Sequence, residues 1–122
     1  MADATRVKRL AGEISQELAL LIRAKLNDKR LGMVTVTGVK VSKDLGYADI
    51  YVTFLAASDD MTSESCVAIL RKASGFLRTE LSKQLKVRST PLLRFHFDEV
   101  NERGFRLDRL IQEAKASRPS SV

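Results

Sequence analysis

The stretch TSESCVAILRKASGFLRTELSKQLKVRSTPLLRFHF, residues 62–97, decides the fold, because it predicts two helices followed by a strand. Apolar side chains recur at helical spacing over residues 62–73 and again over residues 76–85. Gly75 stands between the two patterns, and glycine costs about 1 kcal/mol inside a helix. This position therefore predicts a kink, or a close approach of another molecule, rather than one continuous helix. Apolar and polar residues then alternate over residues 93–97, as in a strand.

The residues before this stretch predict one long helix and a pair of strands. Residues 5–29 carry an apolar stripe whose members are three or four positions apart, and Gly32 marks the helix end. The stripe consists of Val7, Leu10, Ala11, Ile14, Leu18, Leu21, Ile22 and Leu26. Residues 33–41 and 47–55 are strand-like segments joined by a polar turn, which predicts an antiparallel hairpin. The apolar phase of the first segment shifts at Gly38, which predicts a β-bulge there because glycine tolerates the required backbone.

The predicted order is helix, strand, strand, helix, kink, helix and strand, with a short further helix at residues 106–114. This order favours an α+β fold with one core. The helix pair serves as a crossover between strands, so the three-stranded sheet is expected to be mixed. The chain has 122 residues and no internal linker. It is therefore expected to form one domain over residues 1–115, followed by a polar, disordered tail over residues 116–122.

The positive charge of the chain is concentrated in one segment. The formal net charge is +6, and residues 71–94 contain seven basic residues against one acidic residue, Glu80. Such a segment is typical of proteins that bind a polyanion, and the alternative is a solvated basic face kept for solubility. No apolar run approaches the roughly 20 residues of a membrane span, and the N-terminus lacks an apolar signal region. A cytoplasmic protein that does not bind membranes is therefore expected.

Catalytic and metal-binding chemistry has little support in the residue types. Cys66 and His96 are the single cysteine and histidine, and Cys66 lies on the apolar stripe of its helix, as a structural thiol would. They provide no internal disulfide and no histidine-based metal cluster, so neither a metal nor a cofactor is expected. Tyr47 and Tyr51 fall on the polar phase of their strand and give only a weak signal for stacking with bases. Two alternatives to RNA binding remain: a small enzyme built on Cys66 and His96, and a protein–protein adapter that uses the basic segment.

Short motifs along nearly the whole chain resemble the ribosome-binding factor A family, bacterial factors for assembly of the small ribosomal subunit. In order, the motifs are RVKRL (6–10), RLGMVTVT (30–37), VSKDL (41–45), ADIYV (48–52), PLLRF (91–95), ERG (102–104) and DRLI (108–111). The resemblance implies a single KH-like domain of type II. Ordinary KH domains clamp single-stranded nucleic acid with a GXXG loop, whereas this family has an interrupted kink, here Ala73-Ser74-Gly75. The chain also has Asp28-Lys29-Arg30 where the family often has Asp-Pro-Arg, a change expected to alter only loop stiffness.

The resemblance implies a non-catalytic factor that binds the free 30S subunit and its 16S ribosomal RNA late in assembly. It also implies support of 5′-end processing of the 16S precursor, a role in cold adaptation, and release that involves a GTPase or an initiation factor. With the charge pattern, it leads us to expect a monomer that holds RNA phosphates around the kink. The expected RNA-binding residues are Arg71, Lys72, Ala73, Ser74, Gly75, Arg78, Lys83, Lys86, Arg88 and Arg94, with further contacts from Arg6, Lys8 and Arg9.

Overall fold

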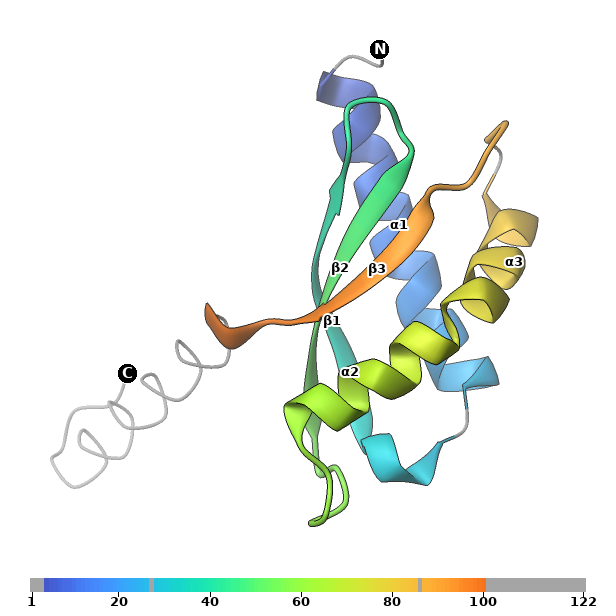
Figure 1. Cartoon of the computed structure of the whole chain (residues 1–122). Coiled ribbons are helices and arrows are strands. Elements are labelled where there is room, and N and C mark those ends of the chain that lie inside the picture. Colours follow the sequence, from blue (N-terminus) through green and yellow to red (C-terminus); the bar gives the residue numbers. More distant parts are fainter. Residues whose placement is uncertain (1–3, 27, 86, 101–122) are drawn as a thin grey trace, which may run out of the picture.

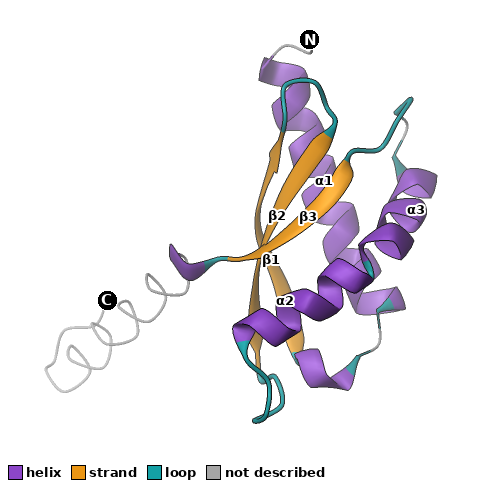
Figure 2. Cartoon of the chain, in the orientation of Figure 1, coloured by secondary structure: helices purple, strands orange, loops and turns teal. Residues whose placement is uncertain are grey.

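The computed structural model describes residues 4–26, 28–85 and 87–100 of the chain. Its elements follow the predicted order of helix, two strands, two helices and strand (Figures 1 and 2). They are α1 (Ala4–Lys25), the 3-10 turn η1 (Lys29–Leu31), β1 (Met33–Val41), β2 (Tyr47–Leu55), α2 (Ser63–Lys72), α3 (Ser74–Gln84) and β3 (Leu92–Phe97). The helix predicted at residues 106–114 and the polar tail lie outside the described residues.

The three strands form one mixed sheet in the order β1-β2-β3. β1 and β2 are an antiparallel hairpin, and β3 pairs parallel to β2 after the crossover through α2 and α3. The predicted α+β fold with a mixed sheet is therefore confirmed. In this order β3 is an edge strand of the sheet.

One hydrophobic core lies between the sheet and the helices. Because strand side chains alternate between faces, Ile50, Val52 and Phe95 all point inward and are fully buried. α1 packs against β1 and α3, while α2 and α3 pack against β3, and all contribute to this core on one face of the sheet (Figure 1). The predicted stripe of α1 is confirmed by its buried residues, Leu10, Ile14, Leu18, Leu21 and Ile22. None of the described helices is long and apolar enough to cross a membrane.

The predicted bulge is present in β1, but its cause is not the one expected. Thr37 is the additional residue, since Val36 and Gly38 both have register partners in β2. The φ angle of Gly38 is not positive, and a Cβ at this position would meet nothing within 4 Å. The Thr37 hydroxyl instead lies 2.6 Å from Asp98 Oδ2 and 3.2 Å from the Tyr51 carbonyl oxygen. Hydrogen bonding by Thr37 therefore supports the bulge.

The predicted end of the first helix is wrong. α1 ends at Lys25 rather than near residue 29, and η1 follows it as a separate turn. The Asp28 carboxylate accepts a hydrogen bond from the backbone N–H of Arg30 (3.0 Å), which caps the start of η1. This turn places Leu31 in the core at 1% exposure. Gly32 therefore caps η1 rather than α1, with φ 63° and ψ −142°.

Candidate nucleic-acid interface

The kink between α2 and α3 falls at Ala73, which ends α2 and precedes α3 with φ −88° and ψ 0°. Gly75 lies in the first turn of α3, its φ is not positive, and a Cβ there would meet nothing within 4 Å. The kink is therefore present beside Gly75, but the fold itself does not require glycine at this position. Phe76, an apolar residue of the pattern over residues 76–85, is 47% exposed, because α3 turns the neighbouring Leu77 into the core.

A groove of about 330 Å³ runs between α3 and β3 beside the kink. It brings together three residues that were predicted to bind RNA, namely Ser74, Gly75 and Arg78. The residues that line it are Ser74, Gly75, Arg78, Thr79, Ser82, Leu92 and Leu93. A second depression of about 740 Å³ lies along α2 and the end of β3, and Arg71 is among its lining residues. Two hollows therefore lie on the α2–α3 side of β3; each contains one arginine, and the larger also contains the carboxylates of Glu64 and Glu99.

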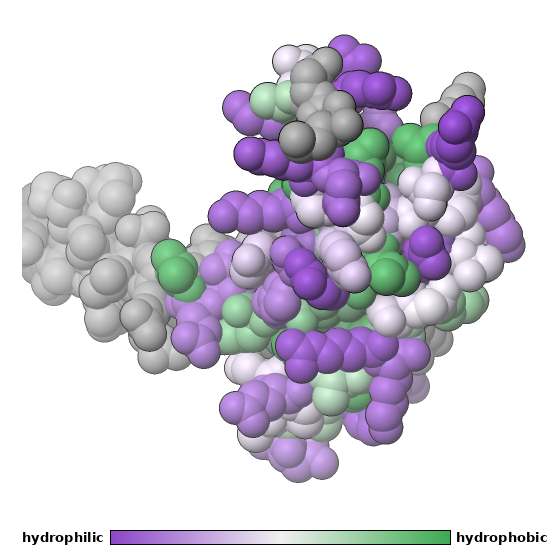
Figure 3. Space-filling view, turned by 45° about the horizontal axis from the view of Figure 1, so that its top comes forward, coloured by the Kyte–Doolittle hydropathy of each residue, from purple (hydrophilic) through white to green (hydrophobic). Residues whose placement is uncertain are grey.

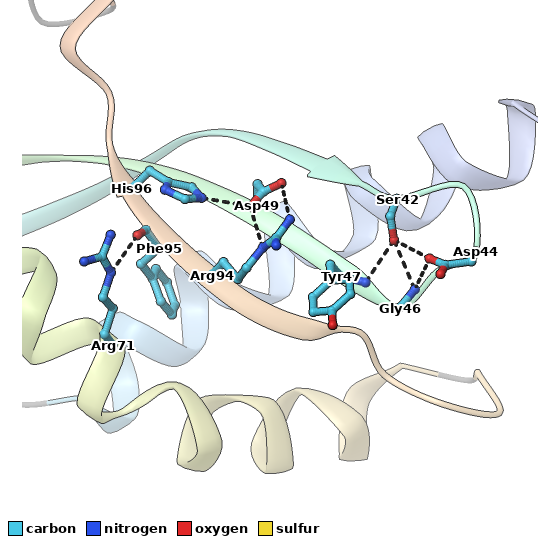
Figure 4. A network of polar contacts seen from close by, with 9 residues as sticks. All are labelled: Ser42, Asp44, Gly46, Tyr47, Asp49, Arg71, Arg94, Phe95 and His96. Atoms are coloured by element: carbon cyan, nitrogen blue, oxygen red, sulfur yellow. Dashed lines mark hydrogen bonds and ion pairs between the residues drawn. The ribbon is translucent and has the colours of Figure 1, made fainter.

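Two arginines of the basic segment tie the helices to β3 and to the loop before it. Arg71 Nε donates a hydrogen bond to the Phe95 carbonyl oxygen (3.2 Å), as Figure 4 shows. Arg78 donates from Nε (3.0 Å) and Nη2 (2.8 Å) to the Thr90 carbonyl oxygen. Each contact uses one edge of the guanidinium, so its other N–H groups remain able to donate hydrogen bonds to a ligand. Sequence reasoning missed this role, because the carbonyl partners carry no signal in the residue types.

Three other cations of the segment, Lys72, Lys83 and Arg88, are exposed. Lys83 forms an i,i+3 ion pair with Glu80 (3.0 Å), yet its side chain is 63% exposed. Lys72 and Arg88 form no ion pair with any other residue that the structure describes. Lys86 lies outside the described residues. The kink surface, as the term is used below, comprises Arg71, Lys72, Ser74, Gly75, Arg78, Lys83 and Arg88.

The other predicted cations lie at the end of the molecule where α1 begins. Arg6, Lys8 and Arg9 are exposed on the first turns of this helix. The same end carries the β1–β2 turn and the loop between α3 and β3, which contains Arg88 (Figure 1). Figure 3 brings this end forward and shows hydrophilic residues over it, with hydrophobic residues only in separate patches. The predicted basic residues therefore extend from the kink toward one end of the molecule.

Arg94 lies on the opposite face of the sheet from the helices, since it alternates with the buried Phe95 along β3. Its guanidinium donates from Nε to Asp49 Oδ1 (2.9 Å) and from Nη2 to Oδ2 (3.0 Å), and His96 Nε2 lies 2.8 Å from Oδ1 (Figure 4). Partial burial acts to raise the pKa of Asp49, but the hydrogen bonds from His96 and Arg94 outweigh it and hold the pKa below its ordinary value. Arg94 is therefore separated from the kink surface by the sheet.

Replacing Asp49 with asparagine is expected to lower the free energy of unfolding at pH 7 by about 1 kcal/mol, because charge-assisted hydrogen bonds are lost. The pKa of Asp49 is lower in the folded protein than in the unfolded chain. Its contribution is therefore complete above about pH 4 and disappears as the pH falls through the folded-state pKa. Urea unfolding of both proteins at neutral and acidic pH measures the difference, with Asp59→Asn as the control. Equal stability at pH 7 would contradict the prediction.

The structure keeps the two members of the conceivable Cys–His dyad apart. Cys66 lies in the core on α2, and burial, with a smaller contribution from Asp28, raises the pKa of its thiol. His96 lies on the other face of the sheet, where it contacts Asp49. The two side chains therefore cannot act as a nucleophile and its base. A buried structural thiol, the interpretation favoured from the sequence, fits this position.

Comparison with known protein families shows which family the chain belongs to. Residues 6–111 match the sequence model of the ribosome-binding factor A family. The chain belongs to this family. A ribosome-binding factor A from Chromohalobacter salexigens is 50% identical over 116 residues, which cover 95% of this chain and 88% of that protein. One from Psychrobacter arcticus is 55% identical over 115 residues, covering 89% of this chain and 86% of that protein.

Solved structures of ribosome-binding factor A share the fold. The crystal structure from Thermus thermophilus has a TM-score of 0.64 at 29% identity, and covers 74% of this chain and 93% of that one. The solution structure of a protein from Thermotoga maritima has a TM-score of 0.63 at 38% identity, and covers 79% and 90%. The KH-like fold expected for this family is therefore confirmed.

A further relative is described in a ribosomal complex. It is a homology model of the Thermus thermophilus ribosome-binding factor A, fitted into a cryo-electron-microscopy map of a 30S complex. Its TM-score with this chain is 0.58 at 29% identity, with 70% of this chain and 87% of that one covered.

Proposed function

We propose that this chain binds the free 30S ribosomal subunit and its 16S ribosomal RNA as a non-catalytic factor late in subunit assembly. The observation that carries the proposal is the family match over residues 6–111, which includes the whole kink surface. The fitted 30S complex of the Thermus thermophilus relative supports the same partner. The exposed cations of the kink surface supply the phosphate-binding chemistry that such a partner needs.

In this proposal the kink surface holds RNA phosphates in three ways. Lys72, Lys83 and Arg88 neutralise them as solvent-exposed cations. Gly75 lets the RNA backbone approach the first turn of α3, whose amides and positive dipole end favour phosphate. Arg71 and Arg78 are held by carbonyl oxygens of the chain near and along the β3 edge, so less entropy is lost when their other N–H groups meet phosphate.

The remaining predicted residues extend this contact. Arg6, Lys8 and Arg9 lengthen the basic surface along α1, Ala73 sets the direction of α3, and Lys86 adds a further cation. Arg94, which pairs with Asp49 on the other face of the sheet, contacts the RNA from that face. The factor acts as a cytoplasmic monomer, supports processing of the 16S precursor at its 5′ end, and contributes to growth in the cold. It leaves the subunit before translation, in a step involving a GTPase or an initiation factor.

Sedimentation of the tagged protein from a cell lysate on sucrose gradients, at low and high salt, tests the proposal. We expect comigration with free small subunits at low salt, loss at high salt, and absence from translating ribosomes. For the purified protein, neutralisation of six phosphates would give a logarithmic salt slope of about −4 to −5. Protein that stays at the top of the gradient at both salts would overturn the proposal. Association that survives nuclease treatment would favour the protein–protein adapter instead.

The role of Gly75 is tested by its replacement with alanine. Gly75→Ala is expected to stabilise the fold by about 0.5–1 kcal/mol, because alanine is the better helix former and its Cβ meets nothing. The same Cβ stands in the way of a close RNA backbone, so we expect about tenfold weaker RNA binding. Gly12→Ala is the matched control, since it also adds a Cβ in open space on a helix. Unchanged affinity of Gly75→Ala would show that RNA does not approach this turn.

A further inference from the structure

No described element covers the face of the sheet opposite the helices. We call this surface the open sheet face; it comprises Lys40, Tyr47, Asp49, Tyr51, Arg94 and His96. Its residues stand in cross-strand rows, because Asp49 pairs in register with Lys40 and Arg94, and Tyr51 pairs with His96. Tyr47 continues the same side of β2 toward the turn. Three strands thus bring these six side chains together.

The planar groups of the open sheet face are held in place by one carboxylate. Asp49 binds the Arg94 guanidinium through both oxygens and also contacts His96 Nε2. The fixed guanidinium lies 4.5 Å from the centre of the Tyr47 ring. At the other end of the row, the Tyr51 and His96 rings are 5.3 Å apart and tilted by 33°. Figure 4 shows His96, Asp49, Arg94 and Tyr47 following one another along β2 and β3.

This arrangement exposes flat surfaces rather than an apolar patch. Tyr47 is 42% exposed, and the side chains of Arg94 and His96 are 51% and 37% exposed. Unpaired RNA bases stack on aromatic rings and guanidinium planes, and each such contact is worth about 1–3 kcal/mol.

The charge of the row also favours RNA. Its two cations, Lys40 and Arg94, outnumber its single carboxylate, Asp49, so the row carries a net positive charge. An apolar protein partner fits less well. Among the described residues, Leu92, 46% exposed, is the one exposed apolar residue that pairs with Tyr47 on this face, while the exposed apolar pair Met33 and Leu55 lies at the far end of the β1–β2 ladder.

We propose that the open sheet face is a second RNA-contacting surface, which takes unpaired bases by stacking on Tyr47, Tyr51 and the planes beside them. The inference rests on the proposed function and deepens it, because it divides the RNA contact between two sides of β3. Phosphates bind the kink surface on the helical side, and bases bind the open sheet face. Since β3 is an edge strand, a single strand of RNA passes around it from one surface to the other.

The composition of the chain provides a direct test. The protein has two tyrosines and no tryptophan, and both tyrosines lie on the open sheet face. Its intrinsic fluorescence therefore reports on this face alone. We expect a single-stranded oligoribonucleotide of about 12 nucleotides to quench this fluorescence in a saturable way. An abasic oligonucleotide of the same length supplies phosphates without bases and should leave the fluorescence nearly unchanged.

Variants separate stacking from charge. Tyr51→Leu and Tyr47→Leu are each expected to weaken binding of the dye-labelled oligoribonucleotide about tenfold, as measured by fluorescence anisotropy. Tyr51→Phe keeps the ring and should bind like the wild type. Circular dichroism and urea unfolding of each variant show that the fold is retained.

The outcomes distinguish this inference from the proposed function. Association with small subunits in the gradient, combined with no tyrosine quenching and wild-type binding by the leucine variants, would overturn the stacking surface alone. Equal quenching by the abasic strand would also overturn it. Leucine variants that lose the subunit but bind the oligoribonucleotide normally would show that this face contacts a ribosomal protein instead. If the wild-type protein binds neither the oligoribonucleotide nor the small subunit, both proposals are overturned.

Discussion

Replacing Gly32 with alanine is expected to lower the free energy of unfolding by about 3 kcal/mol or more. Gly32 has φ 63° and ψ −142°, a backbone conformation that is almost restricted to glycine. A Cβ there would lie 2.3 Å from the Leu55 carbonyl oxygen and 2.5 Å from the Ala56 carbonyl carbon. Both neighbours are backbone atoms of the β2 end, so they cannot move aside as a flexible side chain would. The cost of the unfavourable backbone conformation therefore adds to the cost of displacing the start of β1, and both lower the stability.

Urea unfolding of Gly32→Ala and of Gly12→Ala measures this effect with a matched control. Gly12 lies on an exposed part of α1, and a Cβ there would meet nothing within 4 Å. The same chemical change at this position should stabilise the protein by about 1 kcal/mol, because alanine has the higher helix propensity. Wild-type stability of Gly32→Ala would show that the backbone at this position differs from the one described.

The double charge reversal Lys72→Glu with Arg88→Glu is expected to weaken binding to ribosomal RNA about 10- to 100-fold at moderate salt. Both side chains are exposed, and neither forms an ion pair with another described residue, so the fold should be unaffected. Two fewer phosphate contacts should also make the logarithmic salt slope shallower by about 1.5. Arg78 is less suitable for this test, because its reversal removes two hydrogen bonds to the Thr90 carbonyl oxygen.

The matched control is Lys25→Glu with Lys29→Glu, which changes the net charge equally. These residues lie at the end of α1 and in η1, away from the end that carries Arg88 (Figure 1). Affinity is measured by filter binding over a series of salt concentrations, with circular dichroism to verify folding. Equal losses for the two double variants would indicate attraction by overall charge, and wild-type affinity of Lys72→Glu with Arg88→Glu would place the RNA elsewhere.

The regular elements and their faces were predictable from the sequence because they depend on local periodicity. Alternation placed both hairpin strands correctly, and the stripe of α1 identified its core residues. The helix pair between β2 and β3 required a crossover, which determined the mixed sheet. The error at the end of α1 has a local cause that is weaker than periodicity, the Asp28 cap that starts η1. The exposure of Phe76 depends on how α3 is rotated against the sheet, which periodicity alone does not determine.

The division of the basic segment between two surfaces was decided by the tertiary structure. In the sequence, residues 71–94 form one run of positive charge. In the fold, Arg71 binds a carbonyl oxygen on the helical side of β3, whereas Arg94 binds Asp49 on the other side. Arg94 and Asp49 are 45 positions apart in the chain and come together only through the parallel register of β2 and β3. Composition determined that this protein carries one basic segment, and the order of its periodic segments determined an α+β fold with a mixed sheet. Long-range pairing decided which of the charges remain available to a ligand.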